Sequence, residues 1–459
     1  MTPTIDIVGA GISGLATAWY LDRALPAGGA RIRVWERDDQ PGGLAGSFTT
    51  AGFSVEKFYH HLFRRDVALQ ELIAEAGLAD DLVWRPALTG AYYFDQPYRL
   101  SSPLDLLRFR ALPFADRVRL GLMVLRARTV RDWQALDDVS AMDWIRTVAG
   151  ERVLRVVWEP LLHGKFGAHA PEVSAAWLWS KLVDRGGSRD RRGHELLGYL
   201  RGGLGRLFER MVDVLEARGH AVHLATPVAA LHGDGEEIRA IETPAGALET
   251  DAVVLATQVP DLIALLPRSA SEYAGELARI DFLANVCLVL ELERSLSQFY
   301  WTNVTDPEAP FVGVIEQTRW ADATDFSNRH VAYVSAYVTQ DDPRLEMDAG
   351  ELLESYLPWI RRMFPVFDRA DIAAVHLWRA RSAQPIVRVG FRELVPAITT
   401  PISNLFLCTM AQIYPQDRQV SNGVEIARRT ARLVVERVSP APSGCEADAA
   451  SAPIGDRRT

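Results

Sequence analysis

At 459 residues, the chain is longer than one hydrophobic core usually supports, so two packed units are expected. Its 48% hydrophobic and 24% charged residues are ordinary for a globular protein and exclude a fibrous or wholly disordered chain. The net charge of −9 argues against a nucleic-acid partner, and three scattered cysteines exclude a disulfide framework and a zinc site.

The N-terminus has no basic segment followed by an apolar one, so no signal peptide is expected. No apolar run approaches the roughly 20 residues that a membrane-spanning helix needs. The histidines show no metal-ligand spacing, and no metal is expected. We therefore expect a cytoplasmic protein, at most peripheral to the inner face of the membrane.

The predicted elements begin with a strand, a glycine-rich turn, a helix and a second strand. Residues 5–8 are β-prone, residues 14–25 carry apolar side chains at helical spacing, and residues 32–35 form the next strand. Residues 87–184 are predicted to be mostly helical.

The rest of the chain alternates strands and helices. An amphipathic helix is predicted at 204–218 and ends at Gly219. Further strands are predicted at 221–224, 228–231, 238–243, 252–256, 286–292, 332–338 and 404–408, and further helices at 349–363 and 423–438. Residues 439–459 have the composition of a disordered tail.

Gly9, Gly11 and Gly14 form a G-x-G-x-x-G motif between the first predicted strand and the first predicted helix. Gly9 permits a tight turn, Gly11 lets the backbone approach a pyrophosphate, and Gly14 permits close packing of helix on strand. Glu36 ends the second strand, where its carboxylate can accept hydrogen bonds from ribose hydroxyls. In this context the motif predicts a dinucleotide site rather than a turn that binds nothing.

A second glycine pair, Gly42 and Gly43, follows shortly after Glu36. NAD and FAD share the first motif. However, another stretch of backbone close to the cofactor suits a molecule that continues beyond the pyrophosphate. FAD is therefore the expected cofactor.

These motifs resemble those of the flavin amine oxidase superfamily. The resemblance rests on the glycine motif, on the E-R-x-x-x-P-G-G sequence at 36–43, and on the later segments 202–228 and 250–257. That group includes protoporphyrinogen oxidases, phytoene desaturases and, more distantly, UDP-galactopyranose mutase. The matches cover the cofactor half of the chain, whereas the inserted segments match only loosely.

The resemblance implies which residues hold FAD. Val228 would touch the adenine. The chain departs from many members at Leu44, where they have a basic residue. It also lacks the Gly-Asp or Gly-Glu pair that follows their last strand and contacts the ribityl and pyrophosphate region of the flavin; here Asp417 or Arg418 would take over part of that contact. The expected cofactor-binding residues are Gly9, Gly11, Ile12, Ser13, Gly14, Glu36, Arg37, Gly42, Gly43, Leu44, Ala45, Tyr59, Val228, Ala256, Thr257, Met410, Asp417, Arg418 and Val420.

The fold class implied is α/β: a glutathione-reductase-like, Rossmann-type FAD-binding domain with an inserted α+β substrate domain. The FAD-binding domain is assembled from three separate segments of the chain, 1–86, 185–265 and 385–438. The substrate domain comprises 87–184, which is mostly helical, and 266–384. The tail at 439–459 belongs to neither.

An aromatic and histidine cluster at 58–63 contains His60 and His61. Members of the superfamily bring the chain beside the isoalloxazine ring at this point, and a histidine there could act as a general base or as a charge near the flavin. The alternative is aromatic packing in which one histidine satisfies a local hydrogen bond. His60 is the better candidate.

Four more side chains are candidates for catalysis. Lys165 could meet an anionic substrate group, or be a solvated loop lysine. Arg381 and Gln384 precede the last cofactor segment, where the superfamily often lines the substrate face of the flavin. Glu316 ends an apolar strand, where an acid can be a site residue or merely lie at the strand mouth.

Residues 104–131 form a basic amphipathic stretch with seven arginines and two acids. Such a stretch could lie on an anionic membrane surface and give a lipid-like substrate a dry route to the flavin, as the superfamily resemblance also implies. The alternative is a pair of ordinary surface helices whose arginine stems cover the core.

Three functions remain open from the sequence. The first is an FAD-dependent oxidase or dehydrogenase that moves hydride from a C–N or C–C bond of a hydrophobic or amine substrate to flavin N5. The second is a flavin enzyme of the mutase type that acts on a sugar nucleotide or a lipid-linked sugar. The third is a flavin-binding protein without catalysis. The expected partner is a small-molecule or lipid-like substrate, and the oligomeric state is not predicted.

Overall fold

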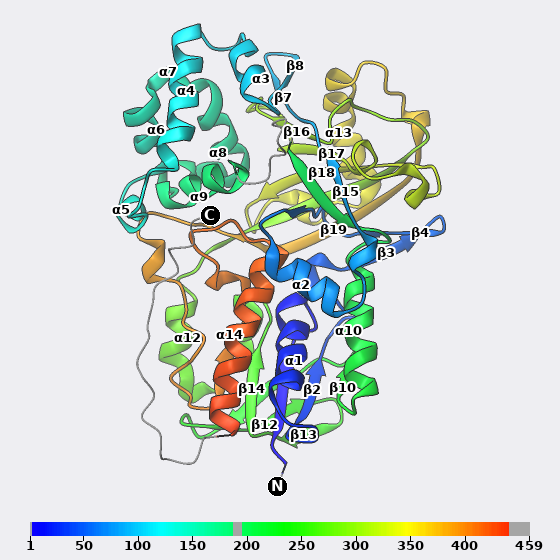
Figure 1. Ribbon diagram of the computed structural model, residues 1–459, viewed down its shortest axis with the longest axis vertical. Helices are drawn as coiled ribbons and strands as arrows, with labels where there is room; N and C mark the ends of the chain where they lie inside the picture. Colours follow the sequence, from blue (N-terminus) through cyan, green and yellow to red (C-terminus); the bar gives the residue numbers. More distant parts are fainter. Residues whose placement is uncertain (1, 187–194, 440–459) are drawn as a thin grey trace.

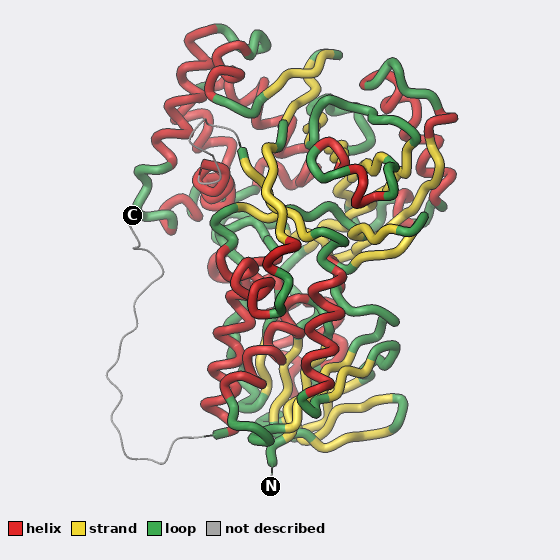
Figure 2. Tube along the Cα trace, turned by 45° about the vertical axis from the view of Figure 1, so that its right-hand side comes forward, coloured by secondary structure: helices red, strands yellow, loops and turns green. Residues whose placement is uncertain are grey.

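The computed structural model describes residues 2–186 and 195–439, so nearly all of the predicted tail lies outside the described residues. Three parts can be followed in Figure 1: an α/β part that contains the N-terminus, a group of helices, and a part built on a mostly antiparallel sheet. Figure 2 shows the helical part and the sheet part side by side above the α/β part.

The α/β part is centred on a five-stranded parallel sheet with the strand order β10-β2-β1-β14-β20. Its strands are β1 (Thr4–Val8), β2 (Arg31–Trp35), β10 (Ala221–His223), β14 (Ala252–Leu255) and β20 (Leu405–Leu407). Val8 pairs with both Trp35 and Leu255, so three strands end at the same edge. Ligands of open parallel sheets bind outside this carboxyl edge.

Helices cover one face of this sheet with a continuous apolar layer. They are α1 (Ile12–Ala24), α2 (Val67–Glu75), α10 (Gly205–Ala217) and α14 (Val420–Val438). Leu15 of α1, Phe208 of α10 and Val424 of α14 are fully buried there. The other face packs against a three-stranded antiparallel sheet and two short helices, namely β11 (Ala230–Gly233), β12 (Ile238–Thr243), β13 (Gly246–Glu249), α11 (Val259–Leu265) and α12 (Ser271–Leu277).

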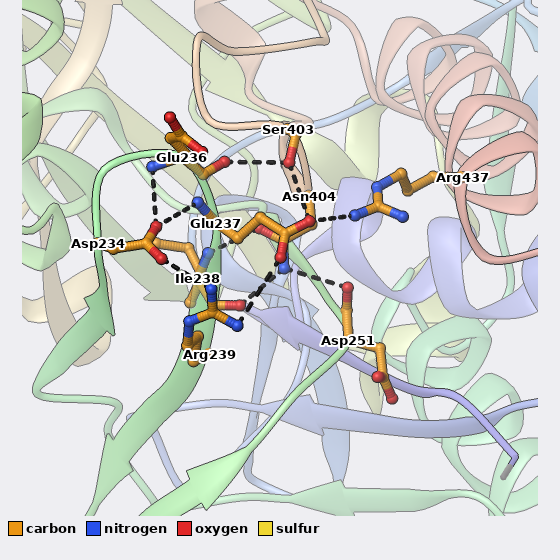
Figure 3. A network of polar contacts seen from close by, with 9 residues as sticks. All are labelled: Asp234, Glu236, Glu237, Ile238, Arg239, Asp251, Ser403, Asn404 and Arg437. Atoms are coloured by element: carbon orange, nitrogen blue, oxygen red, sulfur yellow. Dashed lines mark hydrogen bonds and ion pairs between the residues drawn. The ribbon is translucent and has the colours of Figure 1, made fainter.

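Asn404 ties these distant segments together (Figure 3). Its side-chain amide accepts from Ile238 N at 2.8 Å and donates to Ile238 O at 2.7 Å and to Asp251 O at 3.1 Å. Asn404 is buried, so a side chain unable to make these bonds would leave backbone groups unsatisfied. One amide thus links β12, the start of β14 and β20.

The second sheet has seven strands in the order β19-β15-β18-β17-β16-β7-β8. They are β7 (Thr89–Tyr93), β8 (Gln96–Arg99), β15 (Phe282–Leu292), β16 (Trp301–Val304), β17 (Gly313–Glu316), β18 (His330–Val338) and β19 (Ile372–Pro385). Helix α13 (Ala349–Met363) covers one face, and an aromatic layer that includes Tyr300, Trp320 and Tyr333 covers the other. Every residue of β15 is buried, as expected for a central strand covered on both faces.

The helical part lies within residues 103–186. Its helices are α3 (Pro103–Arg108), α4 (Phe114–Ala127), α5 (Gln134–Asp137), α6 (Ala141–Ala149), α7 (Glu151–Val153), α8 (Glu159–Phe166) and α9 (Ala175–Gly186). The prediction of a mostly helical segment at 87–184 holds from residue 103 onward. It was wrong at the start, because β7 and β8 belong to the seven-stranded sheet and β7 pairs with β16, more than 200 residues later.

Shorter strands connect the parts. The hairpin of β3 (Ser47–Thr50) and β4 (Phe53–Glu56) follows the second glycine pair, and β9 (Leu196–Leu200) pairs with β5 (Leu62–Phe63) and β6 (Leu82–Pro86). The predicted strand at 228–231 begins only at Ala230. Within the described residues no helix is long and apolar enough to span a membrane.

Candidate active site

The first glycine turn leaves β1 at the carboxyl edge of the parallel sheet. Gly9 has a φ of +107°, and a Cβ there would lie 2.8 Å from Ala256 O; a Cβ on Gly14 would lie 1.9 Å from Gly9 O. A Cβ on Gly11, in contrast, would meet nothing within 4 Å. Gly9 and Gly14 therefore serve the turn itself, whereas Gly11 borders open space at the N-terminus of α1, where a phosphate fits.

Glu36 is held beside this turn at the end of β2. Its side chain is buried, with Oε2 accepting from Ala10 N at 2.8 Å and Oε1 accepting from Asp38 N at 3.0 Å. Each carboxylate oxygen has a second lone pair. The carboxylate is thus fixed in place and can still accept from a ribose hydroxyl.

The second glycine pair lies directly against the first turn. Gly42 N donates to Ala10 O at 2.9 Å, and a Cβ on Gly43 would lie 3.5 Å from the Cα of Gly11. Both Gly42 and Gly43 have positive φ, of +117° and +53°. Leu44 is half-buried and Ala45 buried, so this backbone forms a second wall next to Gly11.

The N-terminus of α14 closes the same region from the other side. A Cβ on Gly423 would lie 2.8 Å from Ile12 Cγ2, 3.2 Å from Ser13 Oγ and 3.4 Å from Met410 Sδ, which brings the last helix onto the first turn. Val420 begins that helix. Thr257 Oγ1, beside Gly9, is buried without a hydrogen-bond partner among the described residues. An unsatisfied hydroxyl next to a glycine cradle fits a bound dinucleotide.

Two predicted cofactor residues lie at the margin of this cradle. Arg37 is 63% exposed and pairs with Asp261 at 3.3 Å. Val228 is half-buried against an apolar cluster. Neither has a contact that distinguishes a cofactor role from a structural one.

His60 and His61 differ in their surroundings. His60 Nδ1 lies 2.8 Å from Phe58 O, and because a carbonyl can only accept, Nδ1 carries the proton and Nε2 keeps its lone pair. Burial lowers the pKa of His60 to about 4, so the ring is neutral at pH 7. His61 shares a hydrogen bond with Tyr300 OH at 3.1 Å and packs edge-on against Trp301 and Phe63.

Tyr59 connects this cluster to the seven-stranded sheet. Its ring meets Trp301 edge-on at 4.9 Å, and its hydroxyl interacts with those of Ser335 and Tyr337 on β18. Tyr337 in turn lies under the ammonium group of Lys165, 5.5 Å from the ring centre.

Lys165 is one of two lysines that share a single carboxylate. Lys165 Nζ lies 3.1 Å from Asp417 Oδ1, and Lys181 Nζ lies 2.6 Å from Asp417 Oδ2. Trp177 Nε1 also donates to Oδ1 at 3.3 Å. Burial disfavours the ionised form of Asp417, but Lys165 and Lys181 outweigh it and hold its pKa well below the usual value.

Arg418 follows Asp417 and faces Gln384. Arg418 Nη2 donates to Gln384 Oε1 at 3.4 Å, and Arg418 Nε is buried without a hydrogen-bond partner among the described residues. Burial lowers the pKa of the guanidinium group. Gln384 is itself buried, so the structure brings Lys165, Gln384, Asp417 and Arg418 together.

Two predicted catalytic residues lie elsewhere. Arg381 is 59% exposed and pairs with Glu346 at 2.7 Å. Glu316 is fully buried on β17, where its N–H donates to Tyr300 O at 2.8 Å. Its neighbour Ile315 pairs with Trp301, so Glu316 lies beside the aromatic layer and not at Asp417. Glu316 Oε2 accepts from Leu296 N and Ser297 N, whereas its Oε1 is buried without a hydrogen-bond partner among the described residues.

The sequence reasoning missed Lys181 and Trp177. One signal could have found the first: the chain has three lysines among its 50 basic residues, and two of them meet at Asp417. A lysine in an arginine-dominated chain marks a position where a compact ammonium group is needed.

A glycine cradle for a dinucleotide, a helix N-terminus and a histidine–aromatic wall thus occur in one chain. The family model described as flavin containing amine oxidoreductase matches residues 12–435. The chain belongs to this family. As a flavin containing amine oxidoreductase it has FAD as its cofactor, as predicted from the two glycine motifs, and the predicted fold class is confirmed.

Individual relatives of this flavin containing amine oxidoreductase are distant. A coproporphyrinogen III oxidase from Propionibacterium freudenreichii is 27% identical over 339 residues, which is 62% of each chain, so the match spans less than two thirds of that relative. A proposed protoporphyrinogen oxidase from Exiguobacterium sp. 255-15 has a TM-score of 0.74 at 18% identity, covering 94% of this chain and 98% of that one. Reduced UDP-galactopyranose mutase has a TM-score of 0.72 at 14% identity, covering 96% of both chains. At these identities the two structures establish the fold alone.

Proposed function

We propose that this protein is an FAD-dependent oxidoreductase that moves hydride from a C–N or C–C bond of a hydrophobic or amine substrate to flavin N5. The observation that carries the proposal is the neutral His60, held by Phe58 O in a segment that follows the second glycine turn. The relative named as a coproporphyrinogen III oxidase supports an oxidase. Bound FAD would supply the electron acceptor.

The chain's own residues would hold the cofactor and handle a proton. Gly11, Glu36 and Gly43 would hold the adenosine and pyrophosphate end, and Val420 would present the helix N-terminus to the flavin end. His60 Nε2 would accept the proton that the substrate releases as hydride leaves. The aromatic rings of Tyr59 and Trp301 would exclude water.

The visible spectrum of the purified protein, followed by anaerobic titration with NADPH, tests the proposal. We expect a two-band flavin spectrum that NADPH leaves oxidised and that a reducing substrate bleaches. A holoenzyme that no amine, porphyrinogen or polyene donor reduces would contradict it. A protein that cannot be reconstituted with FAD would contradict cofactor binding as well.

A mutase-type enzyme acting on a sugar nucleotide or lipid-linked sugar is the second candidate. The observation that favours it is the group of cations at Asp417, which suits an anionic substrate. The same titration separates the two candidates, because stoichiometric bleaching by NADPH would indicate an enzyme that needs reduced flavin and no net oxidation.

We further propose that α3 and α4 bind an anionic membrane surface. Of the eleven large apolar side chains exposed in the described residues, six lie on these helices: Leu104, Leu107, Phe114, Val118, Leu122 and Leu125. The four on α4 recur at helical spacing and form one stripe. Asp105 and Asp116 are buried, so the exposed charge of this segment comes mainly from its arginines.

Cosedimentation with vesicles tests the membrane proposal. Vesicles containing phosphatidylglycerol should bind the protein, and pure phosphatidylcholine vesicles should bind it less. The double substitution Leu122→Glu and Leu125→Glu should abolish binding, whereas Val366→Glu, at a side chain that is 75% exposed outside this surface, should not. Equal binding by all three proteins would contradict the proposal.

A further inference from the structure

The lysines of this chain have an unusual distribution. There are three, Lys57, Lys165 and Lys181, against 47 arginines. Lys57 Nζ lies 4.9 Å from the centre of the Trp378 ring, whereas Lys165 and Lys181 meet at Asp417. An arginine binds a carboxylate through a planar fork, while a lysine presents a compact charge with three donors that can serve several acceptors at once.

We name Lys165, Lys181 and Arg418, together with Asp417, the cationic cluster. The cluster is largely shielded from water: Lys165 is 15% exposed, Lys181 29% and Asp417 25%. Aromatic rings complete its walls, with Trp177 4.9 Å from both ammonium groups and Tyr337 5.5 Å from that of Lys165.

Asp417 forms its ion pairs with the two lysines of the cluster and not with Arg418. No carboxylate of the described residues lies within 4 Å of its guanidinium group, and its hydrogen bond to the neutral Gln384 is long, at 3.4 Å. A guanidinium group removed from water is costly unless an anion accompanies it. The buried Nε atom without a partner adds a donor that remains to be satisfied.

The two lysines of the cluster come from parts of the chain that do not form the glycine cradle for the dinucleotide. Lys165 and Lys181 belong to α8 and α9 of the helical part, and Tyr337 and Gln384 belong to the seven-stranded sheet. The pyrophosphate has its own site at Gly11, where the N-terminus of α1 supplies backbone donors. Asp417 and Arg418 lie just before Val420, the first residue of α14, so the cluster borders the flavin end of the cofactor site. An anion bound there by Lys165 and Lys181 would be distinct from a pyrophosphate held at Gly11.

We propose that the cationic cluster binds an anionic group of the substrate, a carboxylate or a phosphate ester. The inference rests on the proposed function, since it identifies the cluster as part of the substrate site of that enzyme. The side chains of His60, Tyr59, Tyr337 and Lys165 then follow one another along the site. They form a wall that is aromatic on the side of His60 and cationic at Lys165. The matching substrate is amphiphilic, with its reacting carbon on the side of His60 and its anion at Arg418.

Anion binding to the oxidised holoenzyme tests this without any turnover. Glutarate and inorganic pyrophosphate serve as probes for the two sources of negative charge, with binding followed by calorimetry and by the flavin difference spectrum. We expect saturable binding of one or both. Preference for glutarate would indicate a carboxylate and preference for pyrophosphate a phosphate ester.

Substitutions of single lysines test whether the anion binds at the cationic cluster. Lys165→Met should weaken it at least about tenfold, and Lys165→Arg should restore part of it, whereas Lys57→Met is the matched control and should leave it unchanged. No saturable binding, or equal binding by K165M and the original protein, would overturn the inference. The outcome is independent of the reaction: a holoenzyme that binds the anion but is reduced by no donor would refute the proposed function and leave the anion site standing.

Lysine acetylation gives a second measurement that does not depend on any variant. With three lysines in the chain, mass spectrometry can follow each of them after treatment with acetic anhydride. The bound anion should slow acetylation of Lys165 and Lys181 and leave that of Lys57 unchanged. Equal effects on all three lysines would overturn the inference.

Discussion

Lys165 and Asp417 form an ion pair across 252 residues of sequence, with Nζ 3.1 Å from Oδ1. Lys165 lies in the last turn of α8 in the helical part, whereas Asp417 precedes α14, the last helix of the α/β part. Ser180 Oγ, on α9, donates to Pro415 O at 2.8 Å and adds a second bond between the same two parts. The helices that carry the lysines are thus fastened to the segment that leads into α14.

Asp417→Asn should therefore destabilise the fold. It leaves Lys165 and Lys181 without their carboxylate, and removing one partner of a mostly buried pair costs about 3 kcal/mol. The folded-state pKa of Asp417 lies below its unfolded value, so its stabilisation is present above about pH 4 and is lost as the pH falls below that. The melting temperature from pH 3 to 8 should show the smallest difference between variant and original at the acid end.

The control for this measurement is Asp261→Asn. Asp261 is 41% exposed and its partner Arg37 is 63% exposed, so this surface pair should contribute less than about 1 kcal/mol. A D417N protein no less stable than D261N would show that the cluster is not held by Asp417.

Local sequence predicted the α/β part well, because its signals lie within a few residues of each other. The turn at Gly9–Gly14 needs glycines for steric reasons that the motif itself expresses, and β1, α1 and β2 lie where their periodicity placed them. The β7–β16 pairing had no such signal, because its partners are more than 200 residues apart.

Among the catalytic candidates, too, some have a local sequence signal and others depend on how distant segments pair. His60 follows the second glycine turn in sequence, and the ring of its neighbour Tyr59 packs edge-on against Trp301. Arg381 and Gln384 lie three positions apart on β19, and because successive side chains of a strand point to opposite faces, the two differ in environment. Arg381 is exposed while Gln384 is buried, and between them the pairing of β19 with β15 also shifts register. No pattern in the sequence predicts that shift.

Gly11 and Gly14 should respond in opposite ways to substitution by alanine. Gly14→Ala places a Cβ 1.9 Å from Gly9 O, so the protein should fold poorly or lose several kcal/mol of stability. Gly11→Ala meets no protein atom within 4 Å, so the fold should survive while the methyl group occupies the space for the pyrophosphate. We expect G11A to melt near the original apoprotein and to bind FAD at least about tenfold more weakly. Unchanged FAD affinity in G11A would refute the placement of the pyrophosphate.

Glu316 should affect stability and not catalysis. Burial raises its pKa from 4.5 to about 7, so its ionised form is disfavoured in the folded protein. The contribution of Glu316 to the free energy of unfolding is greatest below about pH 4.5, where the carboxyl group is protonated in both states. That contribution falls by about 3 kcal/mol in all as the pH rises towards 7. Glu316→Gln should therefore match the original protein at pH 5 and be the more stable one at pH 8.

Thermal unfolding of the holoenzyme at the two pH values measures the effect of E316Q, and the rate of flavin reduction is the accompanying control. That rate should be unchanged, since the Glu316 carboxylate accepts from Leu296 N and Ser297 N and takes no part in the proposed proton transfer to His60. A reduction rate lowered tenfold or more would restore Glu316 as a catalytic candidate.

Substitutions of His60 and His61 should differ in their effect on the rate of flavin reduction. His60→Asn removes the Nε2 lone pair that the proposed proton transfer uses, and general-base catalysis typically contributes 100-fold or more, so the rate should fall by about that factor. His61→Asn loses its hydrogen bond to Tyr300 and its edge-on ring contacts, and should mainly lower the melting temperature. Because burial lowers the pKa of His60 to about 4, the rate for the original protein should stay level from pH 8 to 5 and fall only near pH 4. Stopped-flow reduction across that range measures both effects, and a fall centred near pH 6.5 in the original protein would mean that His60 is not the base.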